Sequence, residues 1–199
     1  MKIVCLDLEG VLVPEIWIDF AKESGICQLT RTTRDEPDYD KLMKWRIGIL
    51  NENHMTLKDI QQTIAKIQPL PGAKDFLDSL RKLTQVVIVS DTFTQFAQPL
   101  MEKLGWPTIF CNELIVDEQD RIVDYRMRCK ESKLTTVKHL QAMGFETIAA
   151  GDSFNDLGMI ANSKAGFLFR STPSIISAYP MYPAFNSYAD LLEAIKKEL

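Results

Sequence analysis

Two carboxylates follow the first apolar run of this chain. Residues 3–6 read Ile-Val-Cys-Leu, and Asp7 and Glu9 come next, with Gly10 directly behind them. Because like charges held at one place repel each other, this pattern predicts a bound cation beside the two acids. Carboxylate oxygens are ligands for Mg²⁺, and a carboxylate can also act as a nucleophile or as a general acid.

Polar side chains close two later apolar runs in a similar way. Ser90 and Asp91 end the run QVVIVSD, and Asp152 and Asp156 stand in GDSFND, after another apolar run. Parallel sheets bind ligands beyond the carboxyl ends of their strands, so we expect these residues to meet in one site. A single Asp at a strand end is more often a turn former, and only the whole set in this order indicates catalysis.

A lysine completes this set. Lys133 begins a helical pattern in which Val137 and Leu140 share the apolar face, and this periodicity directs Lys133 toward the site. Lys130 lies close by in the sequence but precedes the helix, so we choose Lys133.

The elements that must position these residues alternate along the chain. Continuous apolar runs suit strands covered on both faces, and strands that alternate with helices indicate a mostly parallel sheet. Strands are expected within residues 3–6, 85–92, 107–113, 146–156 and 165–171, and helices within 72–83, 94–105, 132–144 and 186–199. Leu83 and Met143 are assigned to the apolar faces of two of these helices. The sequence therefore predicts an α/β fold with a Rossmann-like, doubly wound, mostly parallel sheet.

Three segments depart from this alternation. Residues 14–69 carry helical patterns without a strand, which is too long for a loop and predicts a small helical cap inserted after the first strand. Residues 1–13 and 70–199 would then form the core domain. Residues 113–128 predict a β-hairpin that turns near 118–120, and residues 171–187, with three prolines, are expected to run over the surface.

Composition excludes several classes of protein. The net charge of −4 over 199 residues gives no support for a nucleic-acid or anionic-membrane partner. No apolar stretch is long enough to span a membrane, and the N-terminus does not resemble a signal peptide. The four cysteines form no C-x-x-C pair, so they are expected to be small apolar residues of a reduced, cytoplasmic protein. The sequence does not predict an oligomeric state.

Together these motifs resemble those of the haloacid dehalogenase superfamily of phosphotransferases. The family's Asp-x-Asp motif after the first strand reads D-L-E-G-V-L here, its Ser or Thr is Ser90, its lysine is Lys133, and its G-D-x-x-x-D motif is GDSFND. The resemblance covers the chain from end to end, and the helical segment after the first strand fits the family's type 1 cap.

The resemblance implies a phosphate monoester as substrate and Mg²⁺ as cofactor. Asp7 would attack phosphorus and become an aspartyl-phosphate, and Glu9 would protonate the leaving oxygen and later activate the acceptor. Asp7, the backbone carbonyl of Glu9, and Asp152 would bind the metal, with Asp156 supporting them from nearby. Ser90 and Lys133 would hold the phosphoryl oxygens.

The sequence departs from the common family pattern at two positions. The second acid is Glu9 instead of Asp, so its carboxyl group reaches about one methylene further. Asp91 stands where many phosphatases of the family have Gly. Either its carboxylate binds a cationic group of the substrate, or it points away and only its backbone contributes; we favour the second alternative.

Within the superfamily the chain most resembles the phosphoserine phosphatase branch. In that branch a Glu and an Arg at matching places hold the amino acid, which implies that Glu15 binds the ammonium group and Arg46 the carboxylate. Asn155 would assist at the phosphate or the carboxylate. Without the resemblance, Glu15 is better explained as an acid favoured by a helix N-terminus, and Arg46 as a solvated surface charge.

The stretches DLEGVLVPE, TTRDEPDYDKLMKWR and SDTF resemble a bacterial subgroup of this branch that has two activities. Its members hydrolyse phosphoserine and also transfer the phosphoryl group to homoserine. On this basis we expect both phosphoserine and homoserine as small-molecule partners, and the longer Glu9 is expected to serve the bulkier acceptor. Two alternatives remain: a phosphatase of this superfamily for another small phosphate ester, and a non-enzymatic phospho-accepting regulator.

Overall fold

The first apolar run forms the central strand of the sheet in the computed structural model, which describes residues 1–32, 35–36 and 38–199. β1 (Lys2–Leu6) pairs in parallel with β2 (Gln85–Phe93) on one side and with β5 (Glu146–Gly151) on the other. Val4, Cys5 and Leu6 are fully buried, as expected for a strand that is covered on both faces.

In the described part of the chain the sheet has seven strands, in the order β4-β3-β2-β1-β5-β6-β7. Its other members are β3 (Ile109–Val116), β4 (Ile122–Arg126), β6 (Ala165–Phe169) and β7 (Ala184–Phe185). Only β4 runs antiparallel, against β3. The predicted doubly wound, mostly parallel sheet is therefore confirmed. The strand order reverses at β1, so a crevice opens beyond the carboxyl ends of β1 and its neighbours.

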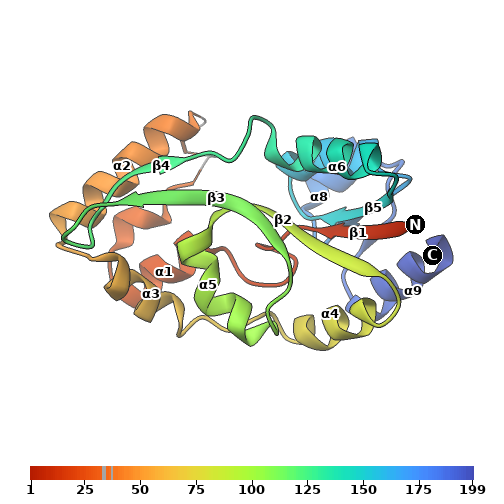
Figure 1. Ribbon diagram of the computed structural model, residues 1–199, viewed down its shortest axis with the longest axis horizontal. Helices are drawn as coiled ribbons and strands as arrows, with labels where there is room; N and C mark the ends of the chain where they lie inside the picture. Colours follow the sequence, from red (N-terminus) through yellow and green to blue (C-terminus); the bar gives the residue numbers. More distant parts are fainter. Residues whose placement is uncertain (33–34, 37) are drawn as a thin grey trace.

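Helices cover both faces of this sheet (Figure 1). One face carries α4 (Ala73–Arg81), α5 (Thr94–Lys103) and α9 (Tyr188–Glu198), and the other carries α6 (Ser132–Ala142), α7 (Leu157–Asn162) and α8 (Pro173–Ala178). Each face buries its own apolar cluster, which gives a three-layer α/β/α arrangement. None of the helices in the described part of the chain is both long and apolar enough to cross a membrane.

Between β1 and α4 the chain forms the predicted helical insertion. It contains α1 (Ile16–Ser24), a short 3₁₀ helix η1 (Cys27–Thr30), α2 (Tyr39–Glu52) and α3 (Leu57–Ile64). Local signals explain its boundaries: Gly25 ends α1 with φ of 75°, the Asp38 carboxylate caps α2, and Thr56 opens α3 with a capping box. Residues 33, 34 and 37, which fall within the stretch TTRDEPDYDKLMKWR, lie outside the described residues.

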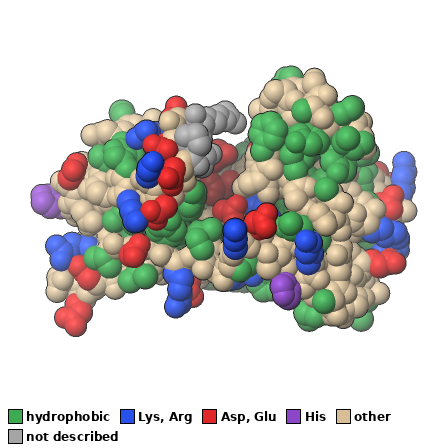
Figure 2. Space-filling model, turned by 90° about the horizontal axis from the view of Figure 1, so that it is seen from above, with side chains coloured by type: hydrophobic (Ala, Val, Ile, Leu, Met, Phe, Trp, Pro, Cys, Tyr) green, Lys and Arg blue, Asp and Glu red, His purple; other side chains and the backbone are tan. Residues whose placement is uncertain are grey.

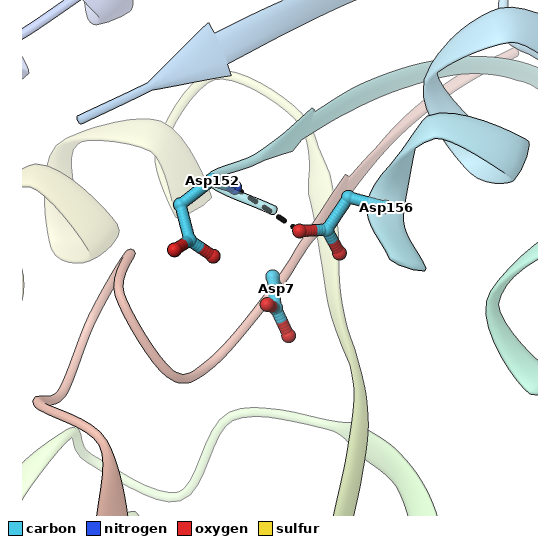
Figure 3. Close-up of side chains that lie close together, drawn as sticks. All are labelled: Asp7, Asp152 and Asp156. Carbon is cyan, nitrogen blue, oxygen red and sulfur yellow. Dashed lines mark hydrogen bonds between the residues drawn. The ribbon is translucent and has the colours of Figure 1, made fainter. Parts of the chain in front are cut away.

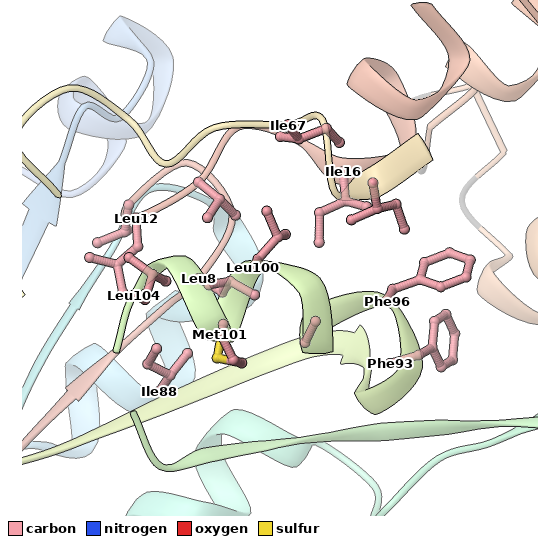
Figure 4. Packing of buried hydrophobic residues seen from close by; sticks show 14 of the residues in the cluster. Leu8, Leu12, Ile16, Ile67, Ile88, Phe93, Phe96, Leu100, Met101 and Leu104 are labelled. Atoms are coloured by element: carbon pink, nitrogen blue, oxygen red, sulfur yellow. The ribbon is translucent and has the colours of Figure 1, made fainter. Parts of the chain in front are cut away.

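The insertion shares its apolar core with the sheet domain. Ile16 of α1 and Ile67 after α3 pack in the same cluster as Phe93, Phe96 and Leu100 (Figure 4). The ring of Trp17 meets Phe96 edge-on, with 5.1 Å between ring centroids. This continuous packing fixes α1, and the residues that precede it, against α5.

The hairpin of β3 and β4 also contacts the insertion. In α2, the Asn51 side-chain amide donates a hydrogen bond to the backbone oxygen of Ile122, at 3.1 Å. The Tyr125 hydroxyl donates to the Asp40 carboxylate at 2.9 Å. The predicted hairpin is confirmed, and its contacts with α2 are an addition that periodicity alone does not reveal.

Several local expectations were wrong. Leu83 and Met143 lie beyond the last residues of α4 and α6, and their side chains are exposed. Residues 171–187 do not simply run over the surface, because they contain α8, with Ile175 buried, and β7, which extends the sheet beside β6. Of the four free cysteines, Cys5 and Cys111 are buried as expected, whereas Cys27 is exposed.

We expect Phe96→Ala to lower the free energy of unfolding by about 3–5 kcal/mol, because it removes a fully buried ring that joins α1 to α5. Urea denaturation measures this change. Phe154→Ala is the matched control: that ring is 60% exposed, and its loss should cost less than about 1 kcal/mol. Equal losses of unfolding free energy in the two variants would contradict an apolar core shared by the insertion and the sheet.

Candidate active site

A small pocket lies at the carboxyl ends of the central strands, between the sheet and the insertion. Its volume is about 140 Å³, well below the roughly 300–1,000 Å³ of sites for drug-sized ligands, so it suits a small metabolite. Figure 2 shows a hollow between two lobes with Asp and Glu side chains inside it. Nine of the ten predicted site residues line the pocket: Asp7, Glu9, Glu15, Arg46, Ser90, Asp91, Lys133, Asp152 and Asn155.

Three aspartates meet at the floor of this site (Figure 3). One carboxylate oxygen each from Asp7, Asp152 and Asp156 lies within 4.8 Å of the others. Asp156, the tenth predicted residue, is fully buried, and its carboxylate accepts hydrogen bonds from the backbone N–H groups of Asp152 and Ser153 at 3.1 and 3.0 Å. Asp156 therefore fixes the turn that presents Asp152.

The acids at this floor repel one another. Burial, and then the charge of Asp156, raises the pKa of Asp7 well above its usual value. The same two causes raise the pKa of Asp152 to about 7. A set of crowded carboxylate oxygens suits a hard divalent cation, which would relieve this repulsion.

A glycine permits the turn after β1 to approach Asp152 closely. Gly10 has φ of +73°, and a Cβ atom at this position would lie 2.5 Å from the Asp152 Cγ. Any side chain here would displace the Asp152 carboxylate, so the small residue behind Asp7 and Glu9 is required by the geometry of the acids.

Lys133 supplies the positive charge that the floor needs. Its Nζ lies 2.9 Å from the Asp7 carboxylate and 2.5 Å from that of Asp156. Burial alone would lower the pKa of Lys133, but the charges of Asp156 and Asp7 outweigh that effect and raise it. Lys130, the other lysine near this position in the sequence, is exposed.

Glu9 lies in the segment between β1, which leads to Asp7, and α1, the first helix of the insertion. Its carboxylate accepts a hydrogen bond from the backbone N–H of Ile16, at 2.9 Å, at the start of α1. Burial, followed by the charge of Glu15, raises the pKa of Glu9 to about 8. This upward shift favours the protonated form of Glu9, which is the form that a general acid requires.

Arg46 is buried, so its explanation as a solvated surface charge is wrong. Its side chain is only 6% exposed, and its guanidinium lies over the Trp17 ring at 4.4 Å from the centroid. One Nη donates to the backbone oxygen of Arg31 at 2.8 Å, while Nε has no hydrogen-bond partner among the described residues. A buried guanidinium in a pocket, with one N–H group that no described residue accepts, is suited to bind an anionic group of a ligand.

Asp91 does not point away from the site. Asp91 lines the pocket, and its carboxylate accepts hydrogen bonds from the Ser132 hydroxyl, at 2.5 Å, and from the side-chain amide of Asn155, another lining residue, at 3.0 Å. Ser90, its neighbour, also lines the pocket and is buried. Adjacent residues of a regular strand face opposite sides, but β2 and β3 change register between Val89 and Phe93.

The pocket also contains residues that we did not predict: Trp17, Ile18, Thr32, Tyr39, Thr92 and Ser153. Two of these had a sequence signal. Tyr39 precedes Arg46 by two helical turns, and Thr92 follows Ser90 by two residues on a strand, so each shares a face with a predicted residue. Trp17 lines the pocket and is also partly buried, because its ring packs edge-on against Phe20 and Phe96.

Comparison with known proteins supports the same conclusion about the family. Residues 1–164 match the family described as haloacid dehalogenase-like hydrolase. The chain is 51% identical to phosphoserine phosphatase ThrH of Pseudomonas aeruginosa, over 96% of this chain and 93% of that protein. It is 49% identical to a phosphoserine phosphatase of Pseudomonas syringae pv. tomato, over 100% of this chain and 86% of that protein.

Solved structures agree at the level of the fold. A phospho-aspartyl intermediate analogue of phosphoserine phosphatase superposes with a TM-score of 0.78 at 19% identity, over 97% of this chain and 98% of that one. A substrate-bound phosphoserine phosphatase complex gives a TM-score of 0.77 at 20% identity, over 98% and 97%. With its sheet order, its helical insertion and its aspartate floor, the chain belongs to the haloacid dehalogenase-like hydrolases.

Proposed function

We propose that this protein is a Mg²⁺-dependent phosphoserine phosphatase that works through an aspartyl-phosphate at Asp7. The observation that carries the proposal is the buried Arg46, in the same pocket as Asp7 and Lys133, with an Nε that has no hydrogen-bond partner among the described residues. A phosphate ester that also bears a carboxylate would engage both Lys133 and Arg46. The names of the two Pseudomonas relatives support phosphoserine as that ester.

Asp7 and Asp152 would hold Mg²⁺, together with the backbone carbonyl of Glu9 and with Asp156 in support. Their crowded oxygens and raised pKa values fit a divalent ion with a preference for oxygen. The ion, once bound, would shield the charge of the phosphate ester from the attacking carboxylate.

In the first half of the reaction, an oxygen of Asp7 forms a bond with phosphorus while the bond from phosphorus to the serine oxygen breaks. Glu9 gives its proton to that leaving oxygen. In the second half, Glu9 takes a proton from water, whose oxygen attacks phosphorus and releases Asp7. Lys133 and Ser90 hold the phosphoryl oxygens throughout.

The insertion would select the substrate. We place the cap at residues 14–69 and the core at residues 1–13 and 70–199, so that the core supplies the chemistry. From the cap, Arg46 would bind the substrate carboxylate and Glu15 its ammonium group. Asn155, on the core side, would contact the phosphate or the carboxylate.

We further propose that homoserine is a second acceptor for the phosphoryl group on Asp7, in a reduced, cytoplasmic setting. Homoserine carries the same ammonium and carboxylate groups as serine, so Glu15 and Arg46 suit both. Glu9, with its extra methylene, is the feature of the site that favours an acceptor larger than water.

The first test follows phosphorus by NMR in a mixture of the protein, phosphoserine, Mg²⁺ and homoserine. We expect signals of inorganic phosphate and of phosphohomoserine, because water and homoserine compete for the same phosphorylated Asp7. Removal of Mg²⁺ by a chelator should abolish both signals. Asp7→Asn is the matched control, because it keeps the size of the side chain but removes the nucleophile.

Each other outcome of this test has a definite meaning. Phosphate without phosphohomoserine rejects the transfer activity and leaves the phosphatase. Intact phosphoserine, with hydrolysis of p-nitrophenyl phosphate, rejects the substrate but not the aspartyl-phosphate chemistry. A durable phosphoprotein without turnover favours the phospho-accepting regulator.

The second test concerns Arg46. Arg46→Lys should raise KM for phosphoserine about 10- to 150-fold, because a charged hydrogen bond of about 1.5–3 kcal/mol is lost. Hydrolysis of p-nitrophenyl phosphate, which has no carboxylate, should change little. Arg31→Lys is the control, since Arg31 also lies over a tryptophan, at 5.2 Å from the Trp45 centroid. Equal effects on both esters would contradict the assigned role of Arg46.

The third test compares two glycines that share a positive φ. Mg²⁺ should raise the melting temperature of the wild type, because a ligand of the native state stabilises it. Gly10→Ala should lose most of this gain, since its Cβ would displace Asp152. Gly25→Ala has the same backbone strain but no atom within 4 Å of its Cβ, and should keep the gain. If Mg²⁺ raises the melting temperature of Gly10→Ala as much as that of the wild type, the metal does not bind at Asp152.

A further inference from the structure

Asp91 joins three separate parts of the active site. It follows Ser90 at the end of β2, and its two carboxylate oxygens bind different elements. One accepts from the Ser132 hydroxyl, in the first turn of α6 and next to Lys133; the other accepts from the Asn155 amide, in the turn that carries Asp152 and Asp156. A single side chain thus spans the loops that bear the serine, the lysine and the late aspartates.

The backbone of Asp91 is hydrogen-bonded by a side chain of the neighbouring strand β3. The Asn112 side-chain amide donates to the Asp91 carbonyl at 2.9 Å, and Asn112 is fully buried. The other end of the same amide accepts from the backbone N–H of Arg128 at 3.0 Å. This bridge supports the irregular end of β2, where the pairing with β3 changes register and the consecutive residues Ser90 and Asp91 both line the pocket.

The contacts of Asp91 also set the orientation of Asn155. The nitrogen of its amide faces Asp91, and its oxygen accepts from the Ser153 hydroxyl. Both ends of the amide are therefore assigned by their partners, and among the described residues the second N–H of the nitrogen has no hydrogen-bond acceptor.

We propose that Asp91 is a positioning residue, which holds Ser132 and Asn155 so that Ser90, Lys133 and the aspartate floor keep one mutual geometry. Both carboxylate oxygens already serve neighbours in the protein, so its effect passes through them and not through a bond to the substrate. The inference rests on the proposed phosphoryl transfer at Asp7, but not on phosphoserine as the substrate.

The test is a mutant cycle read with two esters, phosphoserine and p-nitrophenyl phosphate. Asp91→Ala should lower kcat about 10- to 100-fold for both esters, as is usual when a group that orients ligand-binding residues is removed. Asp91→Asn keeps one acceptor oxygen, so its kcat should lie between that of the wild type and that of Asp91→Ala. In a Ser132→Ala/Asn155→Ala background, Asp91→Ala should change kcat less than about twofold, because its partners are gone. Asp75→Ala, at an exposed acid of α4, controls for the loss of one negative charge.

A second readout does not depend on turnover. The side-chain NH₂ signals of Asn155, assigned by their loss in Asn155→Asp, should shift and exchange faster with solvent in Asp91→Ala than in Asp75→Ala. Unchanged Asn155 signals would overturn the inference, and so would a rise in KM for phosphoserine alone, which would mean direct contact with the substrate. A lower melting temperature with unchanged kcat would overturn it too. If the wild type hydrolyses neither ester, the proposed function fails and the Asn155 signals alone decide.

Discussion

The buried ion pairs of Lys133 are the interaction on which the rest of the site depends. Asp7 and Asp156 lie 2.9 and 2.5 Å from the same ammonium group, and all three side chains are almost entirely buried. Loss of one member of a buried pair typically costs about 3–5 kcal/mol, because its partner stays buried without compensation. One lysine for three crowded aspartates still leaves an excess of negative charge, which gives the floor its affinity for a cation.

The fold brings these charges together at small conformational cost. β1, β2 and β5 are neighbours, so residues that are far apart in the sequence end at one edge of the sheet. Gly10 then lets the chain after β1 approach Asp152, and Gly151 does the same for Asp156, whose side chain occupies the place of a Cβ. The chemistry is thus built on rigid strand ends, and little of it depends on long loops.

The fold and the chemical residues could be predicted because their signals are local. A continuous apolar run, a polar residue at its end and a helix that follows are all visible within a few positions. The recognition residues are different. The Arg46 guanidinium is covered by the Trp17 ring, and the Trp17 ring is in turn held by its contact with Phe96 of α5, a helix that packs on the sheet. The spacing of α2 alone is compatible with an exposed arginine, so periodicity could not decide this point.

Asp91 shows the same limit most clearly. Strand alternation places Ser90 and Asp91 on opposite faces, and this argument would be sound if β2 paired regularly along its whole length. The side chain of Asn112, fully buried on the neighbouring strand, instead binds the Asp91 carbonyl and supports an irregular end. No pattern within SDTF contains that information, because the partner lies 21 residues further along the chain. The site therefore combines a locally encoded set of reactive groups with a mutual arrangement that only the tertiary structure specifies.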